Sequence, residues 1–206
     1  MAAACELIDQ TGTDAFSMRT LARRLETSTA TIYRHVTGME ELRILVVDRL
    51  LGEVLASAAG RPPPGTWQEA ARTELLLFHD ALSRHPNLLG LFASEVPIGP
   101  NGLAVRERTI TRLLEFGFPV SLAARAYTTL AHYVIGFLAP QHAPDAPGPR
   151  QAAALRRYYL ALDPAEYPST VAAADALTTV SHDDEFLEGL QFILDGIDTA
   201  LARGGD

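Results

Sequence analysis

The 206-residue sequence has a single cysteine, no lysine and no long apolar run. One cysteine, Cys5, cannot form an intrachain disulfide and suits a reducing compartment. No apolar run reaches the roughly 18 residues that a bilayer-spanning helix needs. The opening MAAACELIDQTG also lacks the basic start and long apolar middle of a cleavable signal. These absences predict a soluble, cytoplasmic protein without a membrane partner.

Short motifs typical of catalytic and metal sites are missing as well. The six histidines never form HExxH or another close ligand pair with a carboxylate or a cysteine. The sequence contains no GxSxG, no glycine-rich phosphate loop and no CxxC. We therefore expect no enzymatic activity, no catalytic residue, no metal site and no cofactor. His132, within AHYVIG, is expected to be a buried, hydrogen-bonded histidine.

Charge restricts how the chain can contact nucleic acid. The sequence has 17 basic and 25 acidic residues, a formal net charge of −8. Such a surface repels phosphate as a whole, so any contact with nucleic acid must be local. The segment from Ser17 to His35 has four arginines and one glutamate, which gives it a local charge of +3.

Hydrophobic periodicity predicts helices throughout the chain. Apolar residues recur at steps of three and four, as in Leu42, Val46, Leu50 and in Phe186, Leu190, Ile193, Ile197, Leu201. No strand alternation bounded by hairpin turns is present. Breaker-rich segments divide the chain into four helices up to about residue 55 and five or six longer ones after it. The segment APQHAPDAPGP, at 139–149, predicts a loop because its proline-rich residues 140–149 cannot form a helix interior.

The first two helices have recognisable boundaries. Residues 2–10 form an amphipathic helix with Leu7 and Ile8 inward, and Gly12 is a natural C-terminal stop. Ser17 can cap a second helix, MRTLARRL. Its predicted buried residues are Met18, Leu21, Ala22 and Leu25.

Two more helix starts follow. Thr27 or Ser28 can cap a third helix, in which Ile32 and Val36 are the buried pair. Residues 37 and 40, threonine and glutamate, have the S/T-x-x-E spacing of a capping box at the start of a fourth helix, so Thr37 and Glu40 are expected to bond reciprocally. Two short helices separated by a tight turn, the second exposing small polar groups, form a helix-turn-helix.

The predicted third helix has side chains suited to a major groove. Small residues at its start let the backbone approach base edges and supply methyl and hydroxyl groups. The larger residues after them are expected to face the sugar-phosphate walls. The predicted DNA-contacting residues are Arg19, Ser28, Thr29, Ala30, Thr31, Tyr33, Arg34 and His35.

Each of these features also fits a purely structural role. The octapeptide STATIYRH, taken alone, is equally a polar helix of an ordinary bundle. Arg23 and Arg24 suit a solvated face, and His35 suits a helix end, where a partial positive charge is favourable. The spacing of the whole unit is more informative than any one residue.

The unit lies in the ungapped segment ACELIDQTGTDAFSMRTLARRLETSTATIYRHVTGMEELRILVVDRL, which includes TIYRHV. This segment resembles the DNA-binding domain of the TetR family of bacterial transcriptional regulators. FHDALSRHPNLLGLFASEVPIGP, LLEFGFPVSLAARAYTTLAHYVIGF and EFLEGLQFILDGI are similar to the C-terminal domain of the tetracycline-repressor subgroup. The resemblance implies an all-α fold, with a three-helix helix-turn-helix DNA-binding domain at 1–41 and a larger helical effector-binding and dimerisation domain at 42–206.

The resemblance also implies a homodimer. The last and third-last long helices of the family pair into a four-helix bundle, here about 120–138 and 183–202. The first of these is apolar on two faces. A helix needs two such faces when one packs in the core of its own chain and the other packs on the second copy of the chain in a homodimer. A fully buried helix in a monomer is the alternative. In the family, a ligand shifts the fourth helix, here 37 to about 55, and changes the spacing of recognition helices that must lie about 34–36 Å apart.

Family pocket positions fall on Leu55, Glu74, Phe78, Phe92, Val105, Arg108 and Tyr127. This set is mostly apolar, with a few polar groups to orient a guest. Tetracycline repressors hold a magnesium-drug complex through two histidines, and Leu55 and Phe92 occupy those positions here. Neither side chain binds a metal, so we do not expect tetracycline to be sensed by that route. Glu74 and Arg108 also fit as surface charges, and Phe78 and Phe92 as core residues.

Three departures from the family pattern weaken the expected DNA contact. Glu26 replaces the usual glycine of the turn, where a left-handed conformation costs about 1–2 kcal/mol. Met39 replaces a lysine that grips phosphate. The first helix begins almost at Met1, without the basic extension of many relatives, which a start codon further upstream would restore. We expect modest affinity with a steep salt dependence.

The expected function is that of a ligand-responsive repressor. The homodimer binds a palindromic double-stranded DNA operator and is released by an unknown small apolar or amphipathic effector. Two alternatives stay open. One is a TetR-like dimer that binds a small molecule or a protein partner without productive DNA binding, and the other is an activator or a co-repressor-dependent regulator.

Overall fold

The computed structural model describes residues 1–141 and 149–204, and every secondary-structure element in these ranges is a helix. The predicted all-α class is therefore confirmed. The loop predicted at 139–149 falls mostly outside the described residues, but its described ends, 139–141 and 149, are helical, so the prediction is wrong there. No helix in the described ranges is long and apolar enough to cross a membrane.

Three short helices form the N-terminal domain: α1 (Ala2–Thr11), α2 (Met18–Arg24) and α3 (Thr29–Ile32). As predicted, Leu7 and Ile8 of α1 are buried. Gly12 ends the helix with a φ of 77° and donates its backbone N–H to the carbonyl of Ile8. Cys5 is also buried in α1, and this burial is the main cause that raises the pKa of its thiol.

The start of α2 agrees with the sequence, and its end does not. Ser17 caps the helix, with reciprocal bonds between Ser17 and Thr20. The prediction that Leu25 is buried is wrong, because this side chain is 48% exposed. The helix ends at Arg24 and the chain turns there, so the spacing of three and four residues no longer places position 25 on the buried face.

The predicted capping box at the start of α4 (Met39–Ala58) is wrong by one residue. The helix begins after Gly38, so Glu41 and not Glu40 occupies the third helical position. Its carboxylate accepts hydrogen bonds from the backbone N–H and the hydroxyl of Thr37. These two bonds hold the pKa of Glu41 below its ordinary value.

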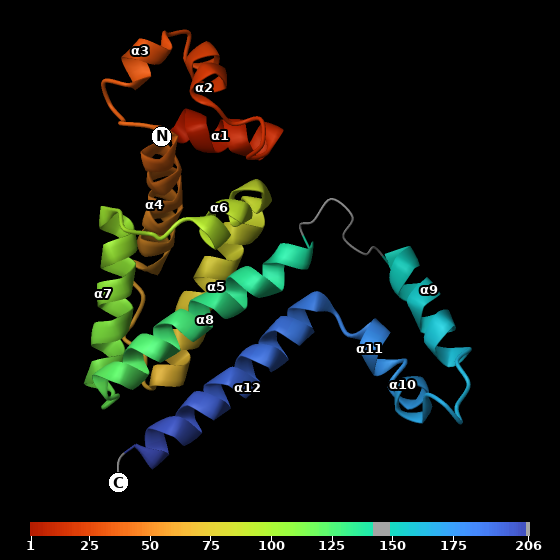
Figure 1. Ribbon diagram of the computed structural model, residues 1–206. Coiled ribbons are helices and arrows are strands. Elements are labelled where there is room, and N and C mark those ends of the chain that lie inside the picture. Colours follow the sequence, from red (N-terminus) through yellow and green to blue (C-terminus); the bar gives the residue numbers. More distant parts are fainter. Residues whose placement is uncertain (142–148, 205–206) are drawn as a thin grey trace.

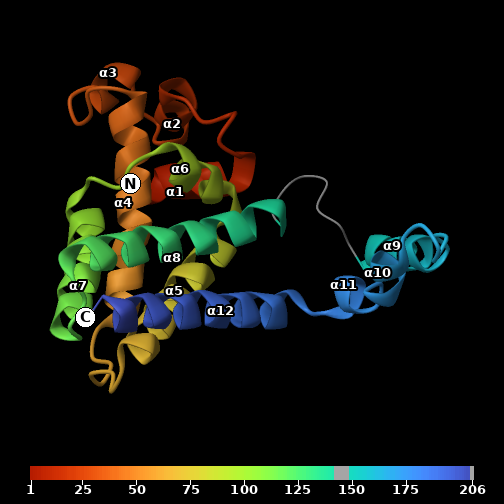
Figure 2. The same ribbon diagram turned by 60° about the horizontal axis from the view of Figure 1, so that its bottom comes forward.

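The remaining helices form the C-terminal domain. They are α5 (Trp67–Arg84), η1 (Pro86–Leu88), α6 (Leu89–Ser94), α7 (Pro100–Glu115), α8 (Val120–Gln141), α9 (Pro149–Leu160), α10 (Pro168–Ala172), α11 (Ala176–Thr179) and α12 (His182–Arg203). In Figure 1, α4 runs from the N-terminal helices into this domain, where it packs on α5 and α7. Helix α8 lies across α5 and α7, with α12 alongside it. Figures 1 and 2 both show α9–α11 to one side of this body.

The core face of α8 is made of small and branched residues. Its buried members are Ala123, Ala126, Leu130, Val134 and Leu138. Other apolar side chains of α8 are only partly covered, including Tyr127 and Ile135, and Ala124 is exposed. On α12, Phe186, Leu190 and Leu194 are buried, whereas Phe192 is 73% exposed. Both helices thus combine a core face with an uncovered face in this single chain.

Candidate nucleic-acid interface and ligand cavity

Helices α2 and α3 form a helix-turn-helix at the end of the molecule farthest from α12 (Figure 1). Ser28 caps α3, since its hydroxyl accepts the backbone N–H of Thr31 at 3.2 Å. Ile32 and Val36 are buried as predicted, but α3 ends at Ile32, so Val36 lies beyond the helix that was expected to contain it. One face of α3 is held inward and the other is free to contact a partner.

The predicted DNA-contacting residues divide by environment. Those that are exposed are Arg19, Ser28, Thr29, Ala30, Tyr33, Arg34 and His35, while Thr31 is half-buried. Tyr33 is 55% exposed, an unusual position for a large aromatic ring. The hydroxyl of Thr31 lies 3.0 Å from that of Ser28 and accepts a hydrogen bond from Arg34 at 3.3 Å. Ser28 and Thr31 therefore have a structural role within α3.

The arginines of this domain are not equivalent. Arg24 donates to Glu6 at 2.8 Å and to Gln10 at 2.9 Å, which holds its side chain against α1. Arg19 and Arg23 are exposed on α2. The positive charge available to a partner near α3 therefore comes from Arg19, Arg23 and Arg34.

Glu26 in the turn has a left-handed backbone, with φ at 50°. Within the described residues it is the only non-glycine residue with a positive φ. The side chain is exposed, two residues before Ser28, the N-cap of α3. The turn thus has the conformation that favours glycine, at an energetic cost of about 1–2 kcal/mol for glutamate.

The C-terminal domain encloses a cavity of about 390 Å³ between α4, α5, α6, α7 and α8. Six of the seven predicted effector residues line it: Glu74, Phe78, Phe92, Val105, Arg108 and Tyr127. Leu55 does not, because the side chains of Leu51 and Val54 form the α4 wall. The rings of Phe78 and Phe92 meet edge to face at 5.5 Å between centroids. His132 also lines the cavity but is exposed, so the expectation that it is buried is wrong.

A charged group forms one wall of the cavity. The carboxylate of Glu74 accepts a hydrogen bond from Arg112 at 2.8 Å and another from the hydroxyl of Thr109 at 2.8 Å. The Nε atom of Arg108 lies 3.4 Å from the same carboxylate. The side chains of Glu74 and Arg108 are only 13% and 27% exposed. The alternative interpretation of these two residues as surface charges is therefore wrong.

Asp48 joins α4 to the first turn of α7. It is 6% exposed and is the one buried charged residue among those described. Its carboxylate accepts the backbone N–H of Gly102 and the side-chain amide of Asn101, both at 2.9 Å. No side chain of α7 itself caps this helix. Asp48 of α4 therefore accepts a hydrogen bond from a free backbone N–H group at the N-terminus of α7, a helix that lines the cavity.

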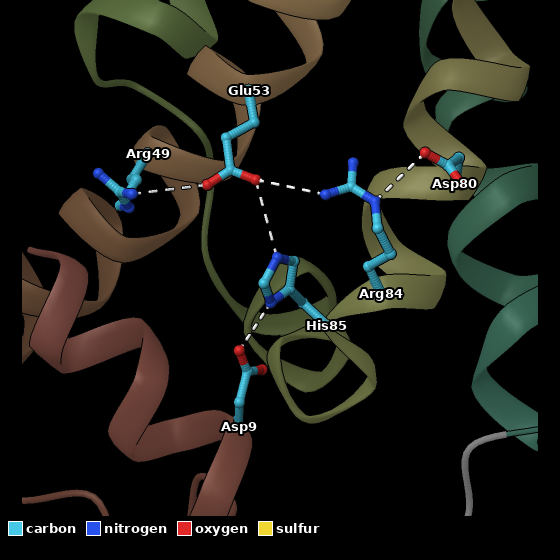
Figure 3. Close-up of polar contacts among 6 residues, drawn as sticks. All are labelled: Asp9, Arg49, Glu53, Asp80, Arg84 and His85. Carbon is cyan, nitrogen blue, oxygen red and sulfur yellow. Dashed lines mark hydrogen bonds and ion pairs between the residues drawn. The ribbon is translucent and has the colours of Figure 1, made fainter.

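A second polar group joins the N-terminal domain to α4 and α5 (Figure 3). The His85 ring, just after α5, lies 2.6 Å from Asp9 of α1 through Nδ1 and 3.7 Å from Glu53 of α4 through Nε2. Glu53 also lies between Arg49, at 3.7 Å, and Arg84, at 3.8 Å. We call these five residues the junction. It connects three helices from both domains.

Only indirect signals for these two connections are present in the sequence. Asp48 lies in LVVDRLL, where its apolar neighbours are buried on both sides, and a carboxylate in such a setting needs a partner. His85 precedes a proline at the end of α5. This pattern predicts a turn, but it does not predict any contact of the His85 side chain. Neither partner lies close in sequence, so spacing could not identify them.

Comparison with known proteins agrees with the two-domain architecture. Residues 1–45 match the family described as bacterial regulatory proteins, tetR family, and residues 59–201 match the tetracyclin repressor-like, C-terminal domain. The chain is 30% identical over 214 residues to the HTH-type transcriptional repressor DrrR1 of Streptomyces coeruleorubidus, over 98% of this chain and 76% of the relative.

Solved structures give the same result. Apo ActR from Streptomyces coelicolor superposes with a TM-score of 0.89 at 30% identity, covering 98% of this chain and 94% of ActR. ActR in complex with actinorhodin superposes with a TM-score of 0.87 at 32% identity, covering 97% of this chain and 95% of ActR. The similarity extends over both domains and over the helices that enclose the cavity.

Proposed function

The chain belongs to the TetR family of bacterial transcriptional regulators, and we propose that it is a repressor whose homodimer leaves its operator when a small molecule fills the cavity. The family is non-enzymatic. One observation carries the proposal: α4 begins at the helix-turn-helix and ends at the cavity, where Leu51 and Val54 form part of the wall. A ligand that alters this wall acts directly on the helix that holds the DNA-binding domain.

The exposed face of α3 supports the DNA-binding part of the proposal. The small residues Thr29 and Ala30 are exposed at its start, where a backbone approaches base edges. Tyr33 and Arg34 follow directly after this helix and suit contacts to phosphate. We assign the DNA-binding domain to residues 1–41 and the effector-binding and dimerisation domain to residues 42–206.

The uncovered faces of α8 and α12 support the homodimer. Leu187 and Phe192 on α12 are exposed, although both are large and apolar. Apolar surface of this kind is usually covered by a partner. A twofold pairing through these helices places two recognition helices on one DNA duplex, and a small change in their separation moves them out of register with the grooves.

Asp48 and the junction support a coupling role for α4. The carboxylate of Asp48 fixes α7 to the middle of α4, and Glu53 fixes the junction to a point near its end. A ligand shifts the equilibrium only if it binds the released conformation more tightly, typically by about 1–3 kcal/mol. These contacts give the cavity a direct physical connection to both α4 and α1.

The test of this proposal is a salt-titrated binding assay with the purified protein and the DNA that flanks its own gene. We expect sequence-selective binding that weakens with salt, because each phosphate contact releases counterions and the slope increases with the number of contacts. Compounds that displace the protein are then candidate effectors. Absence of binding even at low salt supports the alternative, a ligand-binding relative without DNA recognition. Higher transcription of a reporter in the presence of the protein supports an activator.

The left-handed turn gives a second prediction. Glu26→Gly is expected to raise the free energy of unfolding by about 0.5–1 kcal/mol, because relief of the strained backbone exceeds the entropic cost of glycine. It is also expected to raise operator affinity roughly three- to tenfold, because a carboxylate near phosphate is removed. Thermal unfolding and the salt-titrated assay measure the two effects.

Glu26→Gln separates these two causes. It removes the charge and retains the strained backbone, so only the operator affinity should rise. Equal operator affinity for wild type, Glu26→Gly and Glu26→Gln contradicts the placement of this turn beside the DNA backbone.

A further inference from the structure

The side chain of Asp9 depends on a single hydrogen-bond donor. This residue of α1 is half-buried, and its Oδ2 atom lies 2.6 Å from Nδ1 of His85, just after α5 (Figure 3). Its other carboxylate oxygen, Oδ1, is buried without a hydrogen-bond partner among the described residues. A carboxylate in this setting has lost part of its hydration and regains little of it through one bond. The negative charge of Asp9 is therefore stabilised mainly by the His85 ring.

The His85 ring lies between two carboxylates. Nδ1 faces Asp9 of α1, and Nε2 faces Glu53 of α4 at 3.7 Å, which is too long for a hydrogen bond but within the range of an ion pair. A neutral ring has one N–H group and one lone pair, so it leaves one of the two carboxylates facing the lone pair. A charged ring directs an N–H group at each carboxylate. The docked position of α1 therefore matches the charged form of His85.

The other charged groups around the ring belong to α4 and α5. Glu53 lies between Arg49 and Arg84, and Asp80 lies 3.3 Å from Arg84. Together with the carboxylate from α1, these groups have three negative and two positive charges. A charged His85 therefore brings the total charge of the residues in Figure 3 to zero.

Helix α1 brings two further titratable groups close to this site. Cys5 lies near the charge of Asp9, but burial raises the pKa of its thiol, so Cys5 stays neutral up to pH 8. The amino terminus of Met1 acts on Cys5 from the start of the helix. Among the charges that contact the His85 ring, only that of Asp9 is carried by α1. If α1 separates from the end of α5, the ring loses this anion, while the arginines of α4 and α5 stay in place.

We propose that His85 is a proton-dependent contact through which pH regulates how firmly the DNA-binding domain is held to the ligand-binding domain. Proton binding by the ring and docking of α1 favour each other, because Asp9 attracts the proton only when α1 is docked. Histidine ordinarily changes charge between pH 5 and 8. The contact is complete when the ring is charged, at the acidic end of this range, and it weakens as the pH rises. The inference rests on the proposed DNA binding for its effect on the operator.

Two neighbouring contacts provide matched controls. Asn87 of η1 donates from its side-chain amide to the backbone carbonyl of Asp9 at 2.9 Å, so it joins the same two elements without a titratable group. His182 is exposed at the start of α12 and lies 3.8 Å from Glu185, so it is a histidine beside a carboxylate that does not connect the domains.

Thermal unfolding of the full-length protein at pH 6 and pH 8 tests the contact itself. His85→Asn keeps a neutral N–H group in place of Nδ1 and removes the charge. We expect it to lower the Tm by about 2–4 °C more at pH 6 than at pH 8. In the Asp9→Asn background, the same substitution should retain less than half of this difference. Asn87→Ala should lower the Tm equally at both pH values.

Operator binding at the same two pH values tests the regulation. The ratio of the operator affinities at pH 6 and pH 8 should differ between wild type and His85→Asn by about fivefold or more. His182→Gln should keep the wild-type ratio. An equal Tm loss at both pH values for His85→Asn overturns the proposal, and so does an affinity ratio that is the same in wild type and His85→Asn. If wild type binds no operator at either pH, the repressor role fails, and the unfolding measurement alone decides whether the contact depends on a proton.

Discussion

Tyr33→Ala and Arg34→Ala are each expected to weaken operator binding by about 10- to 100-fold while the dimer stays intact. Both side chains are exposed immediately after α3, and each is present twice in the proposed dimer, so every lost contact counts twice. A lost contact of about 0.7–1.4 kcal/mol in each half-site gives this range. Because neither side chain packs in the core, the Tm and the oligomeric state should not change.

Salt dependence separates the roles of these two residues. If Arg34 contacts phosphate in each half-site, its replacement lowers the slope of log affinity against log salt by about 2 per dimer. Tyr33 is uncharged, so its replacement should reduce affinity without changing the slope. Arg61→Ala removes an exposed arginine outside the DNA-binding domain and is the control for net charge. Wild-type affinity in both variants means that the segment at the end of α3 does not face the DNA.

Local signals in the sequence were sufficient for much of the fold. Ser17 caps α2 as expected, Ser28 is the one of its two candidates that caps α3, and Gly12 ends α1. Each of these features depends on residues within four positions of one another. The errors at Leu25 and Glu40 arose at helix ends, where a boundary shift of one residue changes which side chain faces inward or forms the cap.

The two connections to α4 could not be predicted in the same way. Asp48 and its partner Asn101 are 53 residues apart, and Asp9 and His85 are 76 residues apart. Their contacts depend on how whole helices pack, which periodicity does not specify. Resemblance to the family identified most of the cavity lining, but it could not identify the hydrogen bonds between charged residues in that lining. These bonds depend on which side chains donate to Glu74.

Asp48→Ala is expected to lower the free energy of unfolding by about 2–4 kcal/mol. The substitution leaves the N–H of Gly102 buried without an acceptor and removes the cap that α7 lacks from its own residues. Loss of a helix cap costs about 0.5–2 kcal/mol, and loss of a bond to a charged acceptor about 1.5–3 kcal/mol. For a chain of this size, the decrease corresponds to a Tm about 4–16 °C lower.

A glycine substitution tests the same contact from the other side. A Cβ at Gly99 would lie 2.4 Å from the carboxylate of Asp48, although the backbone there, with φ at −70°, accepts any residue. Gly99→Ala should therefore destabilise the protein by displacing Asp48 from α7, without backbone strain of its own. Arg49→Ala, at the neighbouring exposed position, should change the free energy of unfolding by less than about 0.5 kcal/mol. If Asp48→Ala unfolds at the wild-type temperature, Asp48 does not fix α7 to α4, and α4 must sense the cavity through its apolar wall at Leu51 and Val54.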